Sequence, residues 1–133
     1  MMLCLDLTAA YDVPSLASLC GTLTWHRAEK RLTVDDRYCF TDGAAHEIEN
    51  AVIVREEPEI TANSAIIQAG GETAVLHFAG RCCVTSEKLS YRHHNADRFP
   101  SGLAAAWRIA VCGTPELAGS ITIEIISQDR EVD

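Results

Sequence analysis

The sequence predicts an all-β protein built as an antiparallel two-layer β-sandwich. Hydrophobic and polar residues alternate in many short segments, and clusters of Gly, Pro, Asn and Asp separate these segments. Helical periodicity is almost absent from the chain. Short strands at this spacing, joined by turns, are typical of sandwiches. We therefore expect residues 1–133 to form a single β-sandwich domain with one hydrophobic core.

The period-two pattern is clearest between residues 32 and 40. Leu32, Val34, Tyr38 and Phe40 share one face of the predicted strand, and Asp36 interrupts that face. Further strands are expected at residues 3–7, 48–54, 76–78, 103–112 and 121–125.

Three segments carry additional local signals. Gly70-Gly71 separates two apolar segments and predicts a tight hairpin. Residues 14–19, with the sequence PSLASL, form the one plausible helical turn. The alanines of residues 103–112 would also permit a helix, but the β-branched and aromatic residues there favour a strand with Trp107 in the core.

The composition indicates an ordinary globular domain with an acidic charge. Hydrophobic residues make up 47% of the chain, which argues against disorder. The formal net charge of −8 repels phosphate backbones and anionic lipids, so we expect neither nucleic acid nor a membrane as partner. The N-terminus lacks the basic region of a secretory signal. We expect either a cytoplasmic protein, if the chain is complete, or a piece of a longer protein whose localisation is unknown.

The cysteines are expected to be reduced and to lie mostly in the core. The chain is too large and too apolar to resemble a disulfide-stapled secreted domain, and it has no C-x-x-C motif. Most of the cysteines lie in apolar segments, where a free cysteine packs as a small hydrophobic residue. They are Cys4, Cys20, Cys39, Cys82, Cys83 and Cys112.

Two histidines and an aspartate near residue 95 are the strongest candidates for a metal site. His93, His94 and Asp97 could supply part of a metal site. Adjacent side chains on a strand point to opposite faces, however, so His93 and His94 cannot easily bind one ion. We therefore predict a polar loop without a metal, in which His93 and His94 are candidate substrate-binding residues.

Other polar residues have simpler structural interpretations. Cys82 and Cys83 could be a redox pair or metal ligands, but their side chains alternate in direction and favour one buried and one half-buried residue. His26 and His46 lie in alternating segments and are expected to be cross-strand partners rather than catalysts. The acidic residues between 47 and 59 lack the shaped loop of a calcium site and predict a solvated face.

Exposed aromatic side chains could stack on sugar rings. Trp25, next to His26 and Arg27, is the better candidate for an exposed platform, because Trp107 lies in the most apolar segment. Trp25 and Arg27 are therefore the remaining candidate substrate-binding residues.

Several stretches together resemble the C-terminal β region of the heparinase II/III-like polysaccharide lyases. They occur in the order found in that family and cover most of the chain. They are residues Asp6–Tyr11, Leu23–Arg27 followed by Leu32–Tyr38, His46–Asn50 and Ala106–Ile109.

The resemblance implies that a large α/α toroid precedes this β-sandwich in a longer protein. It also implies an activity for the whole protein, the β-elimination of polysaccharides that contain uronic acids. The tyrosine and histidine groups that would catalyse it lie upstream of the matched region. No catalytic residue can therefore be assigned to this chain, and no cofactor is expected.

Three hypotheses for the function follow. The first is a non-catalytic accessory domain, the C-terminal sandwich of such a lyase, which supports the catalytic domain of the parent protein and contacts polysaccharide. Without that catalytic domain it would expose an apolar face, through which a homodimer could form. The second is a free-standing module that binds carbohydrate or another small ligand. The third is a small enzyme or metalloprotein that uses His93, His94 and Asp97.

Overall fold

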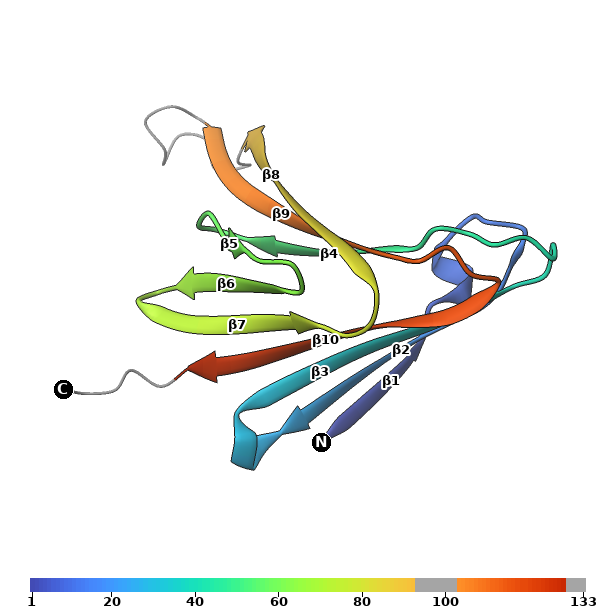
Figure 1. Ribbon diagram of the computed structural model, residues 1–133, viewed down its shortest axis with the longest axis horizontal. Coiled ribbons are helices and arrows are strands. Elements are labelled where there is room, and N and C mark those ends of the chain that lie inside the picture. Colours follow the sequence, from blue (N-terminus) through green and yellow to red (C-terminus); the bar gives the residue numbers. More distant parts are fainter. Residues whose placement is uncertain (93–102, 129–133) are drawn as a thin grey trace.

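The computed structural model describes residues 1–92 and 103–128, and it confirms the all-β sandwich. Strands account for 68% of these residues and helices for 5%. The strands form two antiparallel sheets, and the smaller sheet crosses above the larger one (Figure 1). The helical residues of the described part belong to two short 3-10 helices, η1 (Thr8–Ala10) and η2 (Arg27–Glu29).

The larger sheet has seven strands in the order β1-β2-β3-β10-β7-β6-β5. Strand β10 lies between β3 and β7 and therefore joins the N-terminal strands to the β5–β7 group. The bounds are β1 (Met2–Asp6), β2 (Leu16–His26), β3 (Arg31–Phe40), β5 (Glu59–Ile60), β6 (Ser64–Ala69), β7 (Glu72–Phe78) and β10 (Ala118–Gln128).

The smaller sheet has three strands in the order β4-β9-β8. They are β4 (Glu49–Val54), β8 (Cys82–Arg92) and β9 (Leu103–Gly113). Strand β4 pairs with β9 on one side, so its other side is an edge of this sheet within the described residues. Because the two sheets differ in width, the smaller one covers only part of the larger one.

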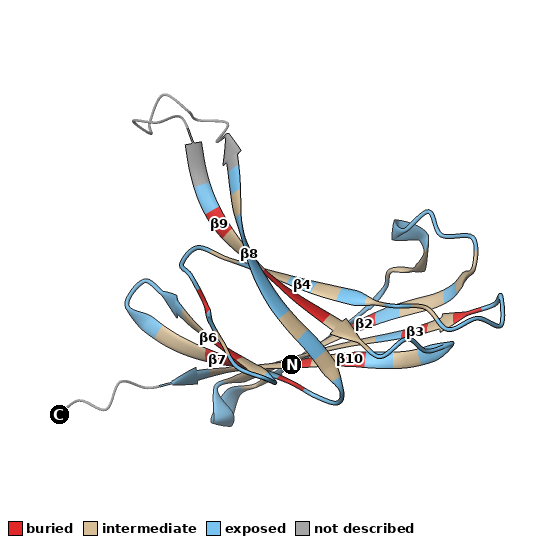
Figure 2. Ribbon diagram, turned by 45° about the horizontal axis from the view of Figure 1, so that its top comes forward, coloured by how far each residue is buried: buried red, intermediate tan, exposed pale blue. Residues whose placement is uncertain are grey.

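The hydrophobic core lies where the smaller sheet covers the larger one (Figure 2). The alternation of residues 76–78 and 121–125 predicted which side chains point inward there, and Leu76 and Ile123 are among the most deeply buried. The smaller sheet contributes the opposing layer. The core residues are Ala65, Leu76, Phe78, Ile109, Val111, Ile121 and Ile123.

Two local predictions have different outcomes. Gly70 and Gly71 join β6 to β7 with φ angles of 60° and 83°, the left-handed region that a two-residue hairpin requires, so this hairpin is confirmed. The helical turn expected at residues 14–19 is wrong. Strand β2 begins at Leu16, which pairs with Phe40 of β3, so pairing along the sheet overrides the local helical preference.

The strand predicted at residues 103–112 is confirmed as β9. Its residues Ile109 and Val111 are fully buried in the core. Trp107, which was expected in the core, is only half-buried. The reason is visible in Figure 2, where the first part of β9 diverges from the larger sheet.

The cysteines are free thiols, as predicted, but none of them is buried. Cys4 and Cys20 are exposed because they alternate with leucines whose side chains occupy the opposite face of β1 and β2. Of the adjacent pair, Cys82 is half-buried and Cys83 is exposed, one step more open than expected. The prediction of core cysteines is therefore wrong, because apolar segments in this protein expose one of their two faces.

Candidate functional site

The inner face of the larger sheet continues beyond the smaller sheet that covers it. One row of paired residues runs across the strands from Leu3 through Leu23 and Val34 to Ile123 and Phe78. Directly paired residues point to the same face of a sheet. Leu3 is 53% exposed, whereas Ile123 and Phe78 are 1% and 4% exposed. The apolar face is therefore covered at one end of the row and open at the other.

Two neighbouring rows repeat this change in burial. Trp25 is 38% exposed and pairs with Leu32, and Leu5 is 41% exposed and pairs with Gly21. We call the uncovered inner surface of β1 and β2 the open face. Its side chains are Leu3, Leu5, Leu23 and Trp25.

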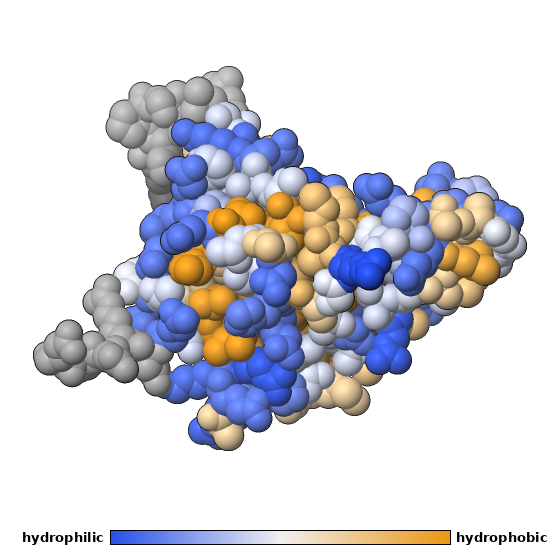
Figure 3. Space-filling model, in the orientation of Figure 1, coloured by the Kyte–Doolittle hydropathy of each residue, from blue (hydrophilic) through white to orange (hydrophobic). Residues whose placement is uncertain are grey.

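Apolar side chains also gather at the other margin of the sandwich. Figure 3 shows them over β4 to β7, between the diverging sheets. Ile60 and Ile67 in this region are half-buried and pack against the core. This margin therefore extends the core, unlike the open face.

A cleft with a volume of about 390 Å³ lies between the smaller sheet, the start of β2 and the end of β3. One wall of the cleft comes from the N-terminal segment and the larger sheet, and its side chains are mostly apolar. The other wall comes from β9 and from the segment that includes β4, and it brings polar groups. The apolar wall includes Leu7, Tyr11, Val13, Leu16, Leu19 and Phe40, and the polar wall includes Glu47, Glu49, Asn50 and Arg108.

Asp36 lies in this cleft and explains the interruption in the apolar pattern of β3. The side-chain amide of Asn50 donates a hydrogen bond of 2.5 Å to Asp36 Oδ2, which links the two sheets. Gly21 makes room for the carboxyl group, since a Cβ at that position would lie 3.0 Å from Asp36 Oδ1. Burial, followed by the neighbouring charge of Asp35, raises the pKa of Asp36, and the bond from Asn50 opposes this.

Arg108 is the only cationic side chain among the described residues that line the cleft. Its guanidinium forms an ion pair with Glu49 and lies 3.8 Å from Glu87 Oε1. Asp36 and Glu47 add further carboxyl groups to the lining. The cleft is therefore suited to a neutral or cationic ligand, and a uronate group would meet an excess of negative charge.

His46 has local structural partners at the edge of the cleft. Its ring stacks on Phe40 with a centroid separation of 4.0 Å, and its Nε2 lies 2.7 Å from Asp42 Oδ2. The hydrogen bond from His46 is the main cause that lowers the pKa of Asp42. The backbone of His46 also forms an isolated antiparallel bridge with Glu116, outside the strands.

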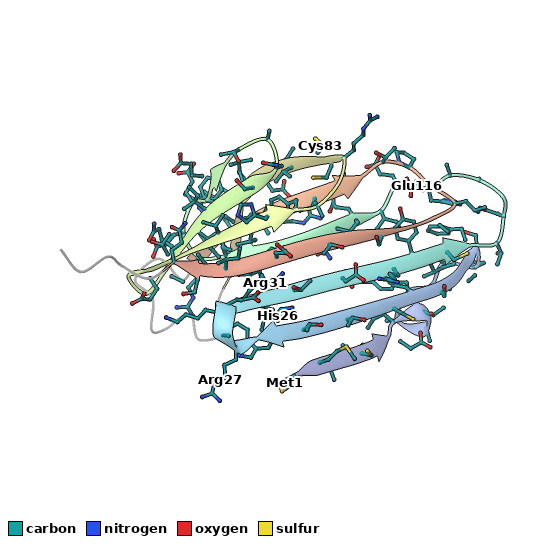
Figure 4. All side chains as sticks on the ribbon, turned by 60° about the horizontal axis from the view of Figure 1, so that its bottom comes forward. Met1, His26, Arg27, Arg31, Cys83 and Glu116 are labelled. Atoms are coloured by element: carbon teal, nitrogen blue, oxygen red, sulfur yellow. The ribbon has the colours of Figure 1, made fainter. Side chains whose placement is uncertain are left out.

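The predicted substrate-binding residues do not come together in one site. Trp25, the better candidate for an exposed platform, is 38% exposed, but it lies on the open face near the end of β2, whereas the cleft lies near the start of that strand. Arg27 belongs to η2 and points away from the sheet at the turn into β3 (Figure 4). His93 and His94, together with Asp97, lie outside the described residues.

Clusters of metal-binding side chains are absent from residues 1–92 and 103–128, where no three His, Cys, Asp or Glu residues could hold an ion together. The acidic residues Glu56, Glu57 and Glu59 are exposed, in agreement with the predicted solvated face. No helix in these residues has the length and apolar character needed to cross a membrane.

The sequence carries one signal for the cleft. The irregular position of Asp36 in an apolar strand face pointed to a buried polar contact, but Asn50 and Arg108 gave no sign of being its neighbours. The fold and site define a two-layer β-sandwich with an open apolar sheet face beside a partly polar cleft. The chain matches no model of a known protein family and none of the curated proteins.

Proposed function

We propose that this chain is a non-catalytic accessory β-sandwich that docks on another protein domain through its open face. The observation that carries the proposal is the row from Leu3 to Phe78, in which an apolar face is buried at one end and exposed at the other. Exposed, contiguous apolar surfaces of this kind typically mark sites of protein contact.

The side chains of the cleft support a structural rather than a catalytic role. Asp36 accepts a hydrogen bond from Asn50, and Arg108 is paired with Glu49. Both pairs are cross-links within the sandwich. A general acid or base needs access to the substrate proton, and these partners already occupy the groups that would supply it.

The resemblance to the heparinase II/III-like lyases gives the proposal its most specific form. The docking partner is then the catalytic toroid of the parent protein, and the sandwich supports it. Three carboxyl groups line the cleft, so the cleft itself favours this supporting role over contact with a uronate-rich polysaccharide. Polysaccharide contact would instead involve Trp25 and Arg27 at the other end of β2.

The open-face proposal is tested with the domain encoded upstream in the same reading frame. We expect the separately produced upstream domain to bind the wild-type chain and to lose at least tenfold in affinity for Leu23→Lys. The matched control is Ile53→Lys, because Ile53 is 58% exposed and lies on the outward face of β4. Circular dichroism establishes that both variants are folded.

Three results would contradict the proposal. One is a stop codon in the genomic frame directly before Met1, combined with a wild-type chain that stays monomeric and binds no hydrophobic dye. Another is equal binding of the upstream domain by the wild type and Leu23→Lys. The third is an equal loss of binding in Ile53→Lys, which would place the contact elsewhere.

A second candidate function is binding of a small ligand, which the cleft supports. Its volume of about 390 Å³ falls in the range of ligand pockets, and it combines apolar walls with a few polar groups. The charges favour neutral sugars or cationic amphiphiles. Ligand-observed NMR tests both, and Asn50→Leu should weaken binding. Binding to neither ligand class, or unchanged binding to Asn50→Leu, would exclude this function for the cleft.

A further inference from the structure

Two cysteines face each other directly on neighbouring strands of the smaller sheet. Cys83 of β8 pairs with Cys112 of β9, and both are free thiols. Their neighbours Val84 and Val111 point into the core, so the two cysteines point to the outward face. Figure 4 shows Cys83 at the margin of the molecule, where it is exposed to solvent.

The pairing geometry brings the two thiols within reach of a disulfide bond. The N–H of Gly113 donates a hydrogen bond to the carbonyl of Ile48, on the β4 side of β9. Because successive residues of a strand direct their backbone polar groups to opposite sides, the N–H and C=O of Cys112 point toward β8. Cys83 and Cys112 are therefore a hydrogen-bonded pair, in which Cα atoms lie about 5.5 Å apart. Disulfides usually join Cα atoms that are about 4.4–6.8 Å apart and Cβ atoms that are about 3.5–4.5 Å apart. The Cα separation of such a pair fits this range, whereas its Cβ atoms, up to about 5.5 Å apart, must approach by about 1 Å for the bond to close.

The two thiols differ in their surroundings. Cys83 is exposed, whereas Cys112 is half-buried, and Cys112 Sγ lies 3.6 Å from Glu49 Oε2. Burial, followed by the negative charge of Glu47, raises the pKa of Cys112. Cys83 is therefore the thiol that an external reagent reaches first, and Cys112 is the one that reacts second.

We propose that Cys83 and Cys112 form a reversible cross-strand disulfide site that reacts with low-molecular-weight disulfides such as glutathione disulfide. The Cys83 thiolate attacks one sulfur of the reagent, forms a mixed disulfide and releases one thiolate. The Cys112 thiolate then attacks Cys83 Sγ and releases the second thiolate. The two protein protons end on the two released thiols, so the protein loses two electrons and the reagent gains two.

The site lies next to the polar side of the cleft. In the reduced state the Cys112 thiol donates its hydrogen bond to Glu49, which also holds Arg108. Disulfide formation removes that donor. Oxidation would therefore leave the Glu49–Arg108 pair at the rim of the cleft with one partner fewer.

The experiment uses the full chain in glutathione buffers of stepped oxidation state. After the free thiols are alkylated, trypsin digestion should yield peptide 82–88 linked to peptide 109–130, with two hydrogens lost. The number of free thiols should fall from six to four. A reductant should reverse both changes. Closure should also speed up with rising pH, because the second step requires the Cys112 thiolate.

Variants decide which sulfurs take part. Cys83→Ser and Cys112→Ser should each prevent the linked peptide, whereas Cys82→Ser should retain it. If Cys83→Ser or Cys112→Ser does not fold, the test uses the peptide maps of the wild-type and Cys82→Ser chains, because the linked peptide in Cys82→Ser can only involve Cys83. The proposal is overturned by a Cys82–Cys83 bond, by mixed disulfides that never close, or by dimers linked through Cys4 or Cys20.

Discussion

Truncation of two apolar side chains in the same row of the larger sheet gives a direct test of the open face. Ile123→Ala removes a side chain that is 1% exposed and lies between Val34 and Phe78. Two sheets hold the resulting cavity open, so we expect a loss of about 3–4 kcal/mol in the free energy of unfolding. Leu3 is 53% exposed, so Leu3→Ala should cost only about 0.5–1 kcal/mol.

Urea unfolding of both variants, followed by circular dichroism at several protein concentrations, measures this difference. For a domain of this size the Ile123→Ala loss corresponds to a decrease of roughly 10 °C in Tm. A Leu3→Ala loss equal to that of Ile123→Ala would show that the open face is covered in solution. If the loss also depended on protein concentration, a second copy would be the cover. A loss below about 1 kcal/mol for Ile123→Ala would refute the placement of the core.

Three further predictions concern single groups. Burial raises the pKa of Asp36 in the folded state above its usual value of 3.8. The stabilisation that the protonated carboxyl group gives the folded state is therefore complete below about pH 3.8, and it is lost as the pH rises through the folded pKa. Asp36→Asn should therefore raise the Tm at pH 7 and leave it unchanged at pH 3; equal effects at both pH values would contradict this. A Cβ at Gly119 would lie 2.8 Å from the hydroxyl of buried Tyr38, so Gly119→Ala should cost about 1–3 kcal/mol in a thermal unfolding assay. Gly113→Ala, whose Cβ would make ordinary contacts at 3.7 Å, is the control and should cost clearly less. The oxidised cross-strand disulfide closes a loop of about 30 residues and should add up to about 3.5 kcal/mol to the free energy of unfolding, so a calorimetric Tm no higher than that of the reduced protein would contradict the entropic reasoning.

The sequence was sufficient to predict the architecture because the alternation of residues has a simple physical meaning. Ile121 and Ile123 alternate with polar residues, and one face of β10 is buried as expected. Leu16 shows the limit of local reasoning, since its segment has helical character and becomes a strand through pairing with Phe40. The preference of a short segment is weak compared with the hydrogen bonds of a sheet.

The candidate site was less predictable, because it depends on contacts between segments far apart in the chain. Asp36 stood out as a polar residue in an apolar face, but its partner Asn50 belongs to the other sheet. Cys83 and Cys112 likewise became neighbours only through the register of β8 and β9. The polar neighbours of Trp25 made it only the better candidate for an exposed aromatic residue, and the incomplete cover of the larger sheet is what exposes it.

The central position of β10 has a consequence for biosynthesis. Ile123 contacts Val34 on one side and Phe78 on the other, yet β10 is made after all the strands that it joins. A ribosome-bound chain that has reached residue 117 therefore presents two bare strand edges, one on β3 and one on β7. Bare edges of this kind recruit strands from other nascent chains, so the yield of native protein should respond to translation speed and to chaperones.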